Sequence, residues 1–165
     1  MGASIATLAV GCGGHTSATG TRTVAPIQRP TPPHYSAYET AMQALGNRLA
    51  LVLEESGIAV RSQGATTDEI VRALRTAQHQ LRVSAAALAK LRPPGKIVAL
   101  HDRLIKGVRD FATELDRVIA SARSGTDGIR IAATIPTLKG LIEMQHASDA
   151  ITRAGYAIVV HAHSG

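Results

Sequence analysis

Glu143 and His146 form a pair of potential metal ligands near the C-terminal end of the chain. On a helix, residues at positions i and i+3 lie on one face, so both side chains could point into a core. Di-iron bundles use this pair, but they need a second Glu-x-x-His pair and a Glu from each of the two remaining helices. The chain has no second Glu-x-x-His. We therefore expect no metal at Glu143 and His146.

Met42 and His146 offer a second set of ligands, because a Met and a His on facing helices can bind haem. The chain contains no C-x-x-C-H motif for covalent haem attachment. A Met in the core and a His on the surface is the simpler interpretation, and we expect no bound cofactor.

Two further histidine groups could do chemistry. His161 and His163 alternate at the C-terminus, where they could form a loose surface site for zinc or copper. His101 is followed by Asp102, but we expect it to lie on the polar flank of a helix and not to act as a base. No serine lies in a G-x-S-x-G or S-x-x-K motif. We expect no catalytic residue and no metal site.

A basic stripe comprises Arg72, Arg75, His79 and Arg82, spaced by 3, 4 and 3 positions. The stripe could contact anionic lipid headgroups or an acidic polymer of the cell envelope, or it could be an ordinary solvated helix face. Nucleic-acid binding would call for stacking aromatic residues. The chain has three Tyr, one Phe and no Trp, so we expect no nucleic-acid partner.

Apolar residues at helical spacing predict the elements that position these side chains. Capping boxes at 36–39 and 66–69 start the first two helices. We expect the first helix to end at Gly57 and the second to run from 67 to 92, before Pro93 and Pro94. A third is expected over 95–123, followed by one or two turns at 127–134. A last helix follows Pro136 and ends at Gly155.

These segments predict an all-α fold, an up-down four-helix bundle over residues 35–165. Apolar residues make up 45% of the chain, so a core of Leu, Ile, Val and Ala is available. Leu81 and Phe111 lie in the middle of their apolar stripes, and we expect both to be buried. The conformation of the tail, 156–165, is left open.

The single cysteine, Cys12, follows an uncharged apolar run at residues 3–11. This run is shorter than the about 20 residues that span a bilayer, but it matches the end of a secretory signal. The tetrapeptide Ala9-Val10-Gly11-Cys12 resembles the lipobox of bacterial lipoproteins. The resemblance implies that the Cys12 thiol carries diacylglycerol and that the signal, residues 1–11, is removed.

Residues 12–34 are rich in Gly, Ser, Thr and Pro, a composition that predicts a disordered, flexible tether between the cysteine and the bundle. Within the bundle, the segment LRPPGKIVALHDRLIKGVRDFATEL at 91–115 is similar to uncharacterised actinobacterial envelope proteins. That similarity implies no activity.

The sequence thus predicts a lipid-anchored protein on the extracytoplasmic face of the cell membrane, acting as an interaction or structural module and not as an enzyme. Its expected partners are the bilayer, through acylated Cys12, and an envelope protein or an anionic polymer. Net charge is +6, which suits anionic partners in general. Two alternatives stay open: an extracytoplasmic bundle that binds a metal, haem or small ligand, and a cytosolic basic bundle.

Overall fold

The computed structural model describes residues 36–156. Cys12, the predicted signal and tether, and the tail with His161 and His163 lie outside the described residues. The described part is mostly helical and contains no strand, which confirms the all-α prediction. Its α-helices are α1 (Ala37–Arg61), α2 (Thr67–Leu88), α3 (Val98–Arg123), α4 (Gly128–Thr134) and α5 (Lys139–Arg153). Short 3-10 helices are η1 (Gly95–Ile97) and η2 (Ile135–Thr137).

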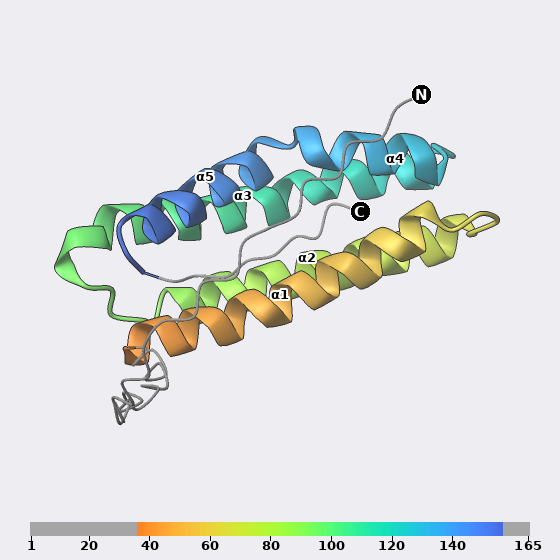
Figure 1. Cartoon of the computed structure of the whole chain (residues 1–165). Coiled ribbons are helices and arrows are strands. Elements are labelled where there is room, and N and C mark those ends of the chain that lie inside the picture. Colours follow the sequence, from red (N-terminus) through yellow and green to blue (C-terminus); the bar gives the residue numbers. More distant parts are fainter. Residues whose placement is uncertain (1–35, 157–165) are drawn as a thin grey trace, which may run out of the picture. The chain divides into compact units, whose positions relative to one another are not determined.

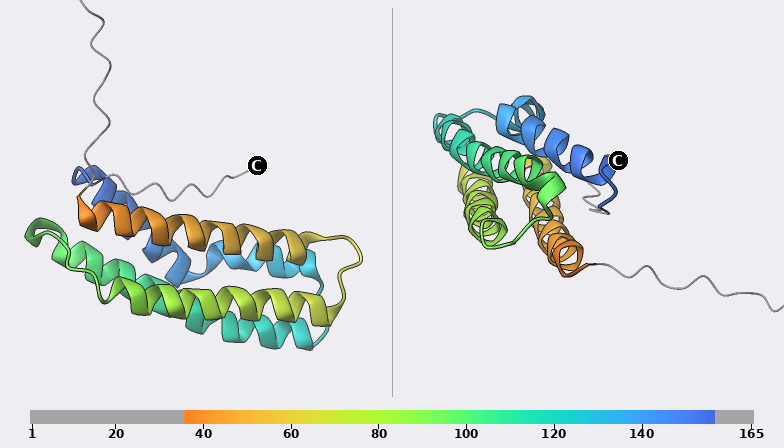
Figure 2. Two further views of the ribbon diagram at one scale, coloured as in Figure 1. Left: turned by 90° about the horizontal axis from the view of Figure 1, so that it is seen from below. Right: turned by 90° about the vertical axis from the view of Figure 1, so that its left-hand side faces the viewer.

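The helices run up and down in chain order (Figure 1). Helices α1, α2 and α3 alternate in direction, and α4 and α5 together return along α3 (Figure 2). Pro136 lies in η2 and separates α4 from α5, since proline has no N–H to continue the α-helical hydrogen bonds. The turns predicted at 127–134 and the last helix predicted after Pro136 are present as α4 and α5, so the described residues contain five α-helices and the four-helix description is approximate.

The predicted capping boxes start α1 and α2. The Ser36 N–H donates to Glu39 Oε2 at 2.8 Å, and the Ser36 hydroxyl accepts from the Glu39 N–H at 3.2 Å. Thr66 and Glu69 make the same pair of bonds. The bonds from Thr66 lower the pKa of the Glu69 carboxyl, because they favour its charged form. These caps satisfy N–H groups that have no partner within the helix.

Two predicted helix ends are wrong. Helix α1 continues through Gly57 to Arg61, and the chain turns at Gly64, whose φ is 81°. A glycine inside a helix costs only about 1 kcal/mol, and burial of Val60 in the next turn offsets that cost. Helix α2 ends at Leu88 and not at 92, since beyond Leu88 the chain forms tighter turns, in which the Lys90 N–H donates to the Ala87 carbonyl and the Leu91 N–H to the Leu88 carbonyl. The predicted ends at 125 and 155 are confirmed, with φ values of 91° and 94°.

The core confirms the predicted apolar stripes and extends them. Leu81 and Phe111 are both buried, as expected. Helices α2 and α3 each pack against two neighbours, so each buries a second row of side chains that a single stripe does not include. This second row consists of Val71, Gln78 and Ala85 on α2 and Ile105, Ala112 and Ile119 on α3.

Two glycines let α3 and α5 approach closely. A β-carbon at Gly107 would lie 2.7 Å from the backbone nitrogen of Met144, and one at Gly140 would lie 2.1 Å from that of Phe111. The Gly140 N–H donates to Glu114 Oε2 at 2.9 Å, which holds the start of α5 against α3. Helices α3 and α5 therefore pack with their backbones in direct contact at these two positions. Among residues 36–156, no helix has the length and apolar character needed to cross a bilayer.

Candidate functional site

Glu143 and His146 lie on the outer surface of α5, and both are exposed. Arg103 Nη2 donates to Glu143 Oε2 at 2.9 Å, and this bond lowers the pKa of the Glu143 carboxyl. Met42 is buried in the core, so it and His146 do not point into a common site. Over the described residues, no three His, Cys, Asp or Glu side chains are grouped as a metal site would need.

The prediction that His101 lies on a polar flank of its helix is wrong. The residue is buried, with 2% of its surface exposed. Its Nε2 lies 3.0 Å from the carbonyl oxygen of Leu88, and its Nδ1 lies 3.0 Å from the Tyr38 hydroxyl. A carbonyl only accepts, so Nε2 carries the proton. In the tautomer with the proton on Nε2, Nδ1 accepts the Tyr38 O–H. Both ring nitrogens are in use, which makes His101 a structural link and leaves no lone pair for base catalysis.

The burial of Tyr38 has an electrostatic consequence. Burial, with a smaller contribution from Tyr156, raises the pKa of the Tyr38 phenol to about 12. The Tyr156 ring meets that of Tyr38 edge-on at 6.2 Å. The phenol therefore stays protonated and remains the donor to His101. The spacing 97, 101, 104, 108 places His101 within the apolar stripe of α3, a signal that could have predicted its burial.

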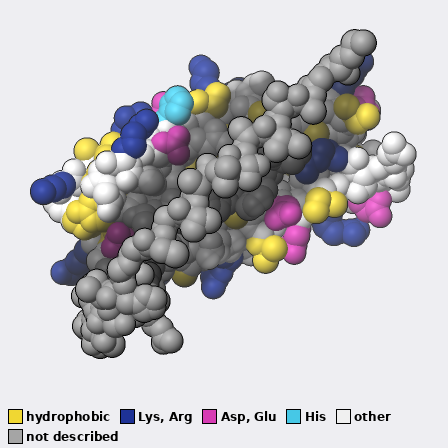
Figure 3. Space-filling view, in the orientation of Figure 1, with side chains coloured by type: hydrophobic (Ala, Val, Ile, Leu, Met, Phe, Trp, Pro, Cys, Tyr) yellow, Lys and Arg dark blue, Asp and Glu magenta, His cyan; other side chains and the backbone are white. Residues whose placement is uncertain are grey.

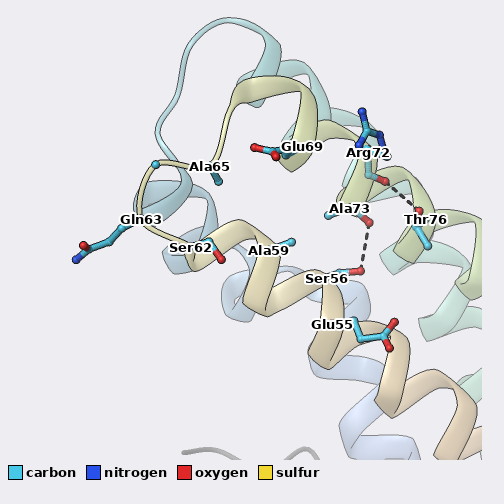
Figure 4. A pocket seen from close by; sticks show the side chains of 11 residues that line it. Glu55, Ser56, Ala59, Ser62, Gln63, Ala65, Glu69, Arg72, Ala73 and Thr76 are labelled. Carbon is cyan, nitrogen blue, oxygen red and sulfur yellow. Dashed lines mark hydrogen bonds between the residues drawn. The ribbon is translucent and has the colours of Figure 1, made fainter.

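A crevice opens between α1 and α2 at the end near their connecting turn (Figure 4). Small side chains, among them Ala59 and Ala73, leave the space open, and Glu55, Glu69 and Arg72 lie around it. The Ser56 hydroxyl donates to the Ala73 carbonyl at 3.2 Å, so it bridges the two helices and is not free to act as a nucleophile. The crevice is lined by both charges and has no nucleophile paired with a base.

The predicted basic stripe is an exposed face of α2, opposite the buried leucines. We call Arg72, Arg75, His79 and Arg82 the α2 basic face; all four are exposed. A shallow hollow lies among Arg72, Arg75 and His79, with Val71 and Thr76 beside them and Asp68 at its edge. The face therefore offers two arginines and a histidine around one surface depression, which Asp68 also lines.

The counter-charges near this face are few. Arg82 Nη2 lies 3.7 Å from Asp116 Oδ2 on α3, and the two side chains are 59% and 60% exposed. The other oxygen of Asp116 accepts from the buried Gln78 amide at 2.7 Å. Arg75 and His79 have no ion-pair partner among residues 36–156.

Some charged side chains on other helices are paired. On α3, Lys106 pairs with Asp110, and Arg103 pairs with Glu143 of α5. The face seen in Figure 3 shows basic and acidic side chains close together. Helix α2 lies behind α1 in that orientation. From 70 to 101, a stretch that includes most of α2, the chain has six Lys or Arg residues and no Asp or Glu.

Comparisons of the chain with protein-family models, with curated proteins and with solved structures find no match.

Proposed function

We propose that this chain is a bacterial envelope lipoprotein, held on the extracytoplasmic face of the cell membrane by an acylated Cys12. The observation that carries the proposal is the sequence Ala9-Val10-Gly11-Cys12, which resembles a lipobox and follows an uncharged apolar run. A diacylglyceryl group supplies two chains, and each buried CH₂ adds about 0.8 kcal/mol, so the anchor would be firm.

The position of the domain supports this proposal. The first element that the structure describes, α1, starts at the Ser36 cap, so the predicted tether, residues 12–34, would lie between the proposed anchor and the bundle. A chain of this length reaches up to about 80 Å when fully extended. The anchored domain could therefore either stand away from the bilayer or lie on its surface.

The described surface supports an interaction or structural role for the domain. Its buried polar side chains bond within the protein: His101 with Tyr38 and Leu88, and Gln78 with Ala112 and Asp116. Because these bonds join neighbouring helices, the buried polar groups are already occupied within the protein. The groups open to partners are the charged side chains on the outside, above all the α2 basic face.

The proposal is tested in the cells that make the protein, with the gene at its own locus. Wild-type protein is expected to sediment with membranes and to enter the detergent phase when a detergent extract is separated. Cys12→Ser removes the acylated sulfur, so it should lack the lipid and appear either as soluble protein or as an uncleaved precursor.

A second variant, Cys12→Ser with Ser17→Cys, is the matched control, since it keeps one thiol but moves it out of the lipobox. It should behave as Cys12→Ser does. Wild-type protein found only in the soluble fraction, or lipid on the thiol displaced to position 17, would contradict the proposal.

A further inference from the structure

We infer that the α2 basic face is a second membrane contact, which binds the phosphates of anionic phospholipid headgroups. The inference deepens the proposed function and rests on it in one respect: the anchor brings the domain to the bilayer. The binding itself is a property of the bundle surface and needs no acyl chain.

The charge pattern of α2 calls for an external anion. Like charges three or four positions apart repel each other on a helix, and Arg72, Arg75 and Arg82 share one face with His79. After Glu69 the next acidic residue in the chain is Asp102. Arg72 and Arg75 therefore repel each other, and phosphate groups would relieve the repulsion.

The acidic groups on neighbouring elements compensate only the two ends of the face. Asp68 and Glu69 lie at the start of α2, where Glu69 is bonded to Thr66, and Glu55 of α1 lies across the crevice from Arg72. Asp116 of α3 is near Arg82 but is also bonded to Gln78. Arg75 and His79, in the middle, form no ion pair within the described domain, although Asp68 lines the same hollow.

The geometry of the face suits a flat anionic surface. From Arg72 to Arg82 the helix advances about 15 Å, so its cations lie in a row along one line. Guanidinium groups bind phosphate oxygens through two parallel hydrogen bonds. Val83, beside Arg82, is 41% exposed and could pack among the headgroups. The side chains thus provide both charge and an apolar contact.

A bilayer is favoured over a soluble polymer as the partner of the α2 basic face, because the tether holds the domain near the membrane. An anchored domain stays within about 80 Å of the membrane surface, which gives a high effective concentration of headgroups. Each Lys or Arg close to an anionic bilayer raises binding about fivefold. Three arginines together correspond to about a hundredfold.

The test uses the full chain carrying Cys12→Ser, so that no acyl anchor contributes. Its binding is measured by sedimentation with vesicles of phosphatidylglycerol mixed with phosphatidylcholine, and with vesicles of phosphatidylcholine alone. On this background, Arg72→Gln, Arg75→Gln and Arg82→Gln are combined in one variant. The matched control combines Arg48→Gln, Arg123→Gln and Arg153→Gln, three exposed arginines on other helices.

We expect the parent chain to bind the anionic vesicles and to lose binding as salt rises. The α2 variant should bind about a hundredfold more weakly, while the control, which loses the same net charge, should change less than about threefold. Circular dichroism checks that both stay helical, since glutamine is a good helix former.

Three results would overturn the inference: equal losses in the two variants, equal binding to both kinds of vesicle, and binding to soluble polyglutamate but not to anionic vesicles. The last would assign the face to an acidic polymer. Because every chain in this assay lacks the Cys12 thiol, its outcome is independent of the anchor, which is tested by the fractionation above.

Discussion

The Tyr38 hydroxyl lies 3.0 Å from Nδ1 of His101, although the two residues are 63 positions apart in the chain. The other nitrogen of the same ring bonds the Leu88 carbonyl. One buried imidazole therefore joins the first turn of α1, the end of α2 and the first half of α3. A link of this kind fixes how the three helices are aligned at this end of the bundle.

Replacing Tyr38 by Phe should destabilise the protein by about 1–3 kcal/mol, because a buried acceptor on His101 loses its donor. Denaturant unfolding at neutral pH measures the loss. Tyr156→Phe is the matched control: its ring also contacts Tyr38, but no hydrogen bond of its hydroxyl to a described residue is seen. Equal stability of wild type and Tyr38→Phe would show that the bond contributes nothing.

Stability should fall at high pH through Tyr38. Its folded pKa of about 12 is raised above the ordinary value of 10.0, so the protonated phenol favours folding. That contribution is complete below pH 10 and is lost as pH rises from 10 through 12. Wild type should therefore lose more stability over this range than Tyr38→Phe does.

Tyrosinate absorbance gives an independent reading of the same titration. One of the three tyrosines should titrate near pH 12 in the folded protein, and that step should be missing from Tyr38→Phe. A wild-type titration that is complete near pH 10 would contradict the assignment.

Much of the fold follows from local sequence patterns. The caps at Ser36 and Thr66 and the stop at Gly125 depend on a few neighbouring residues, so they could be predicted. The end of α1 could not, because Gly57 breaks a helix only if nothing packs beyond it, and Val60 does pack. The short helix α4 and the break at Pro136 before α5 also follow from local residues and could be predicted.

The contacts between distant segments were harder to predict. Nothing in the sequence near Gly107 indicates that Met144 will lie against it. The polarity of His101 suggests a surface position, whereas its place in the apolar stripe points inward. The α2 basic face could be predicted, since it depends only on helical spacing. Its lack of counter-charges depends on what α1 and α3 place beside it.

Gly107→Ala and Gly140→Ala should each destabilise the fold by about 1–3 kcal/mol or more, because the added β-carbon would collide with the backbone of the partner helix. Gly57→Ala is the control. Its β-carbon would meet only the flexible Arg61 guanidinium, at 3.3 Å, so stability should stay equal or rise by up to about 1 kcal/mol. Thermal and denaturant unfolding compare the three, and the same change in all of them would refute the close α3–α5 packing.

Leu81→Ala and Phe111→Ala should each cost on the order of 2–5 kcal/mol, since both side chains fill the centre of the core. Val83→Ala, on the exposed side of α2, should cost much less. Unfolding free energies measure the difference. Losses below about 1 kcal/mol at both core sites would mean that the buried faces are assigned incorrectly.

The mass of the mature N-terminus, measured on protein isolated from the cells that make it, tests the central claim most directly. The lipoprotein proposal predicts an N-terminal peptide that begins at Cys12 and carries the mass of a diacylglyceryl group. An N-terminal peptide in which residues 1–11 are still attached and the Cys12 thiol is unmodified would contradict it.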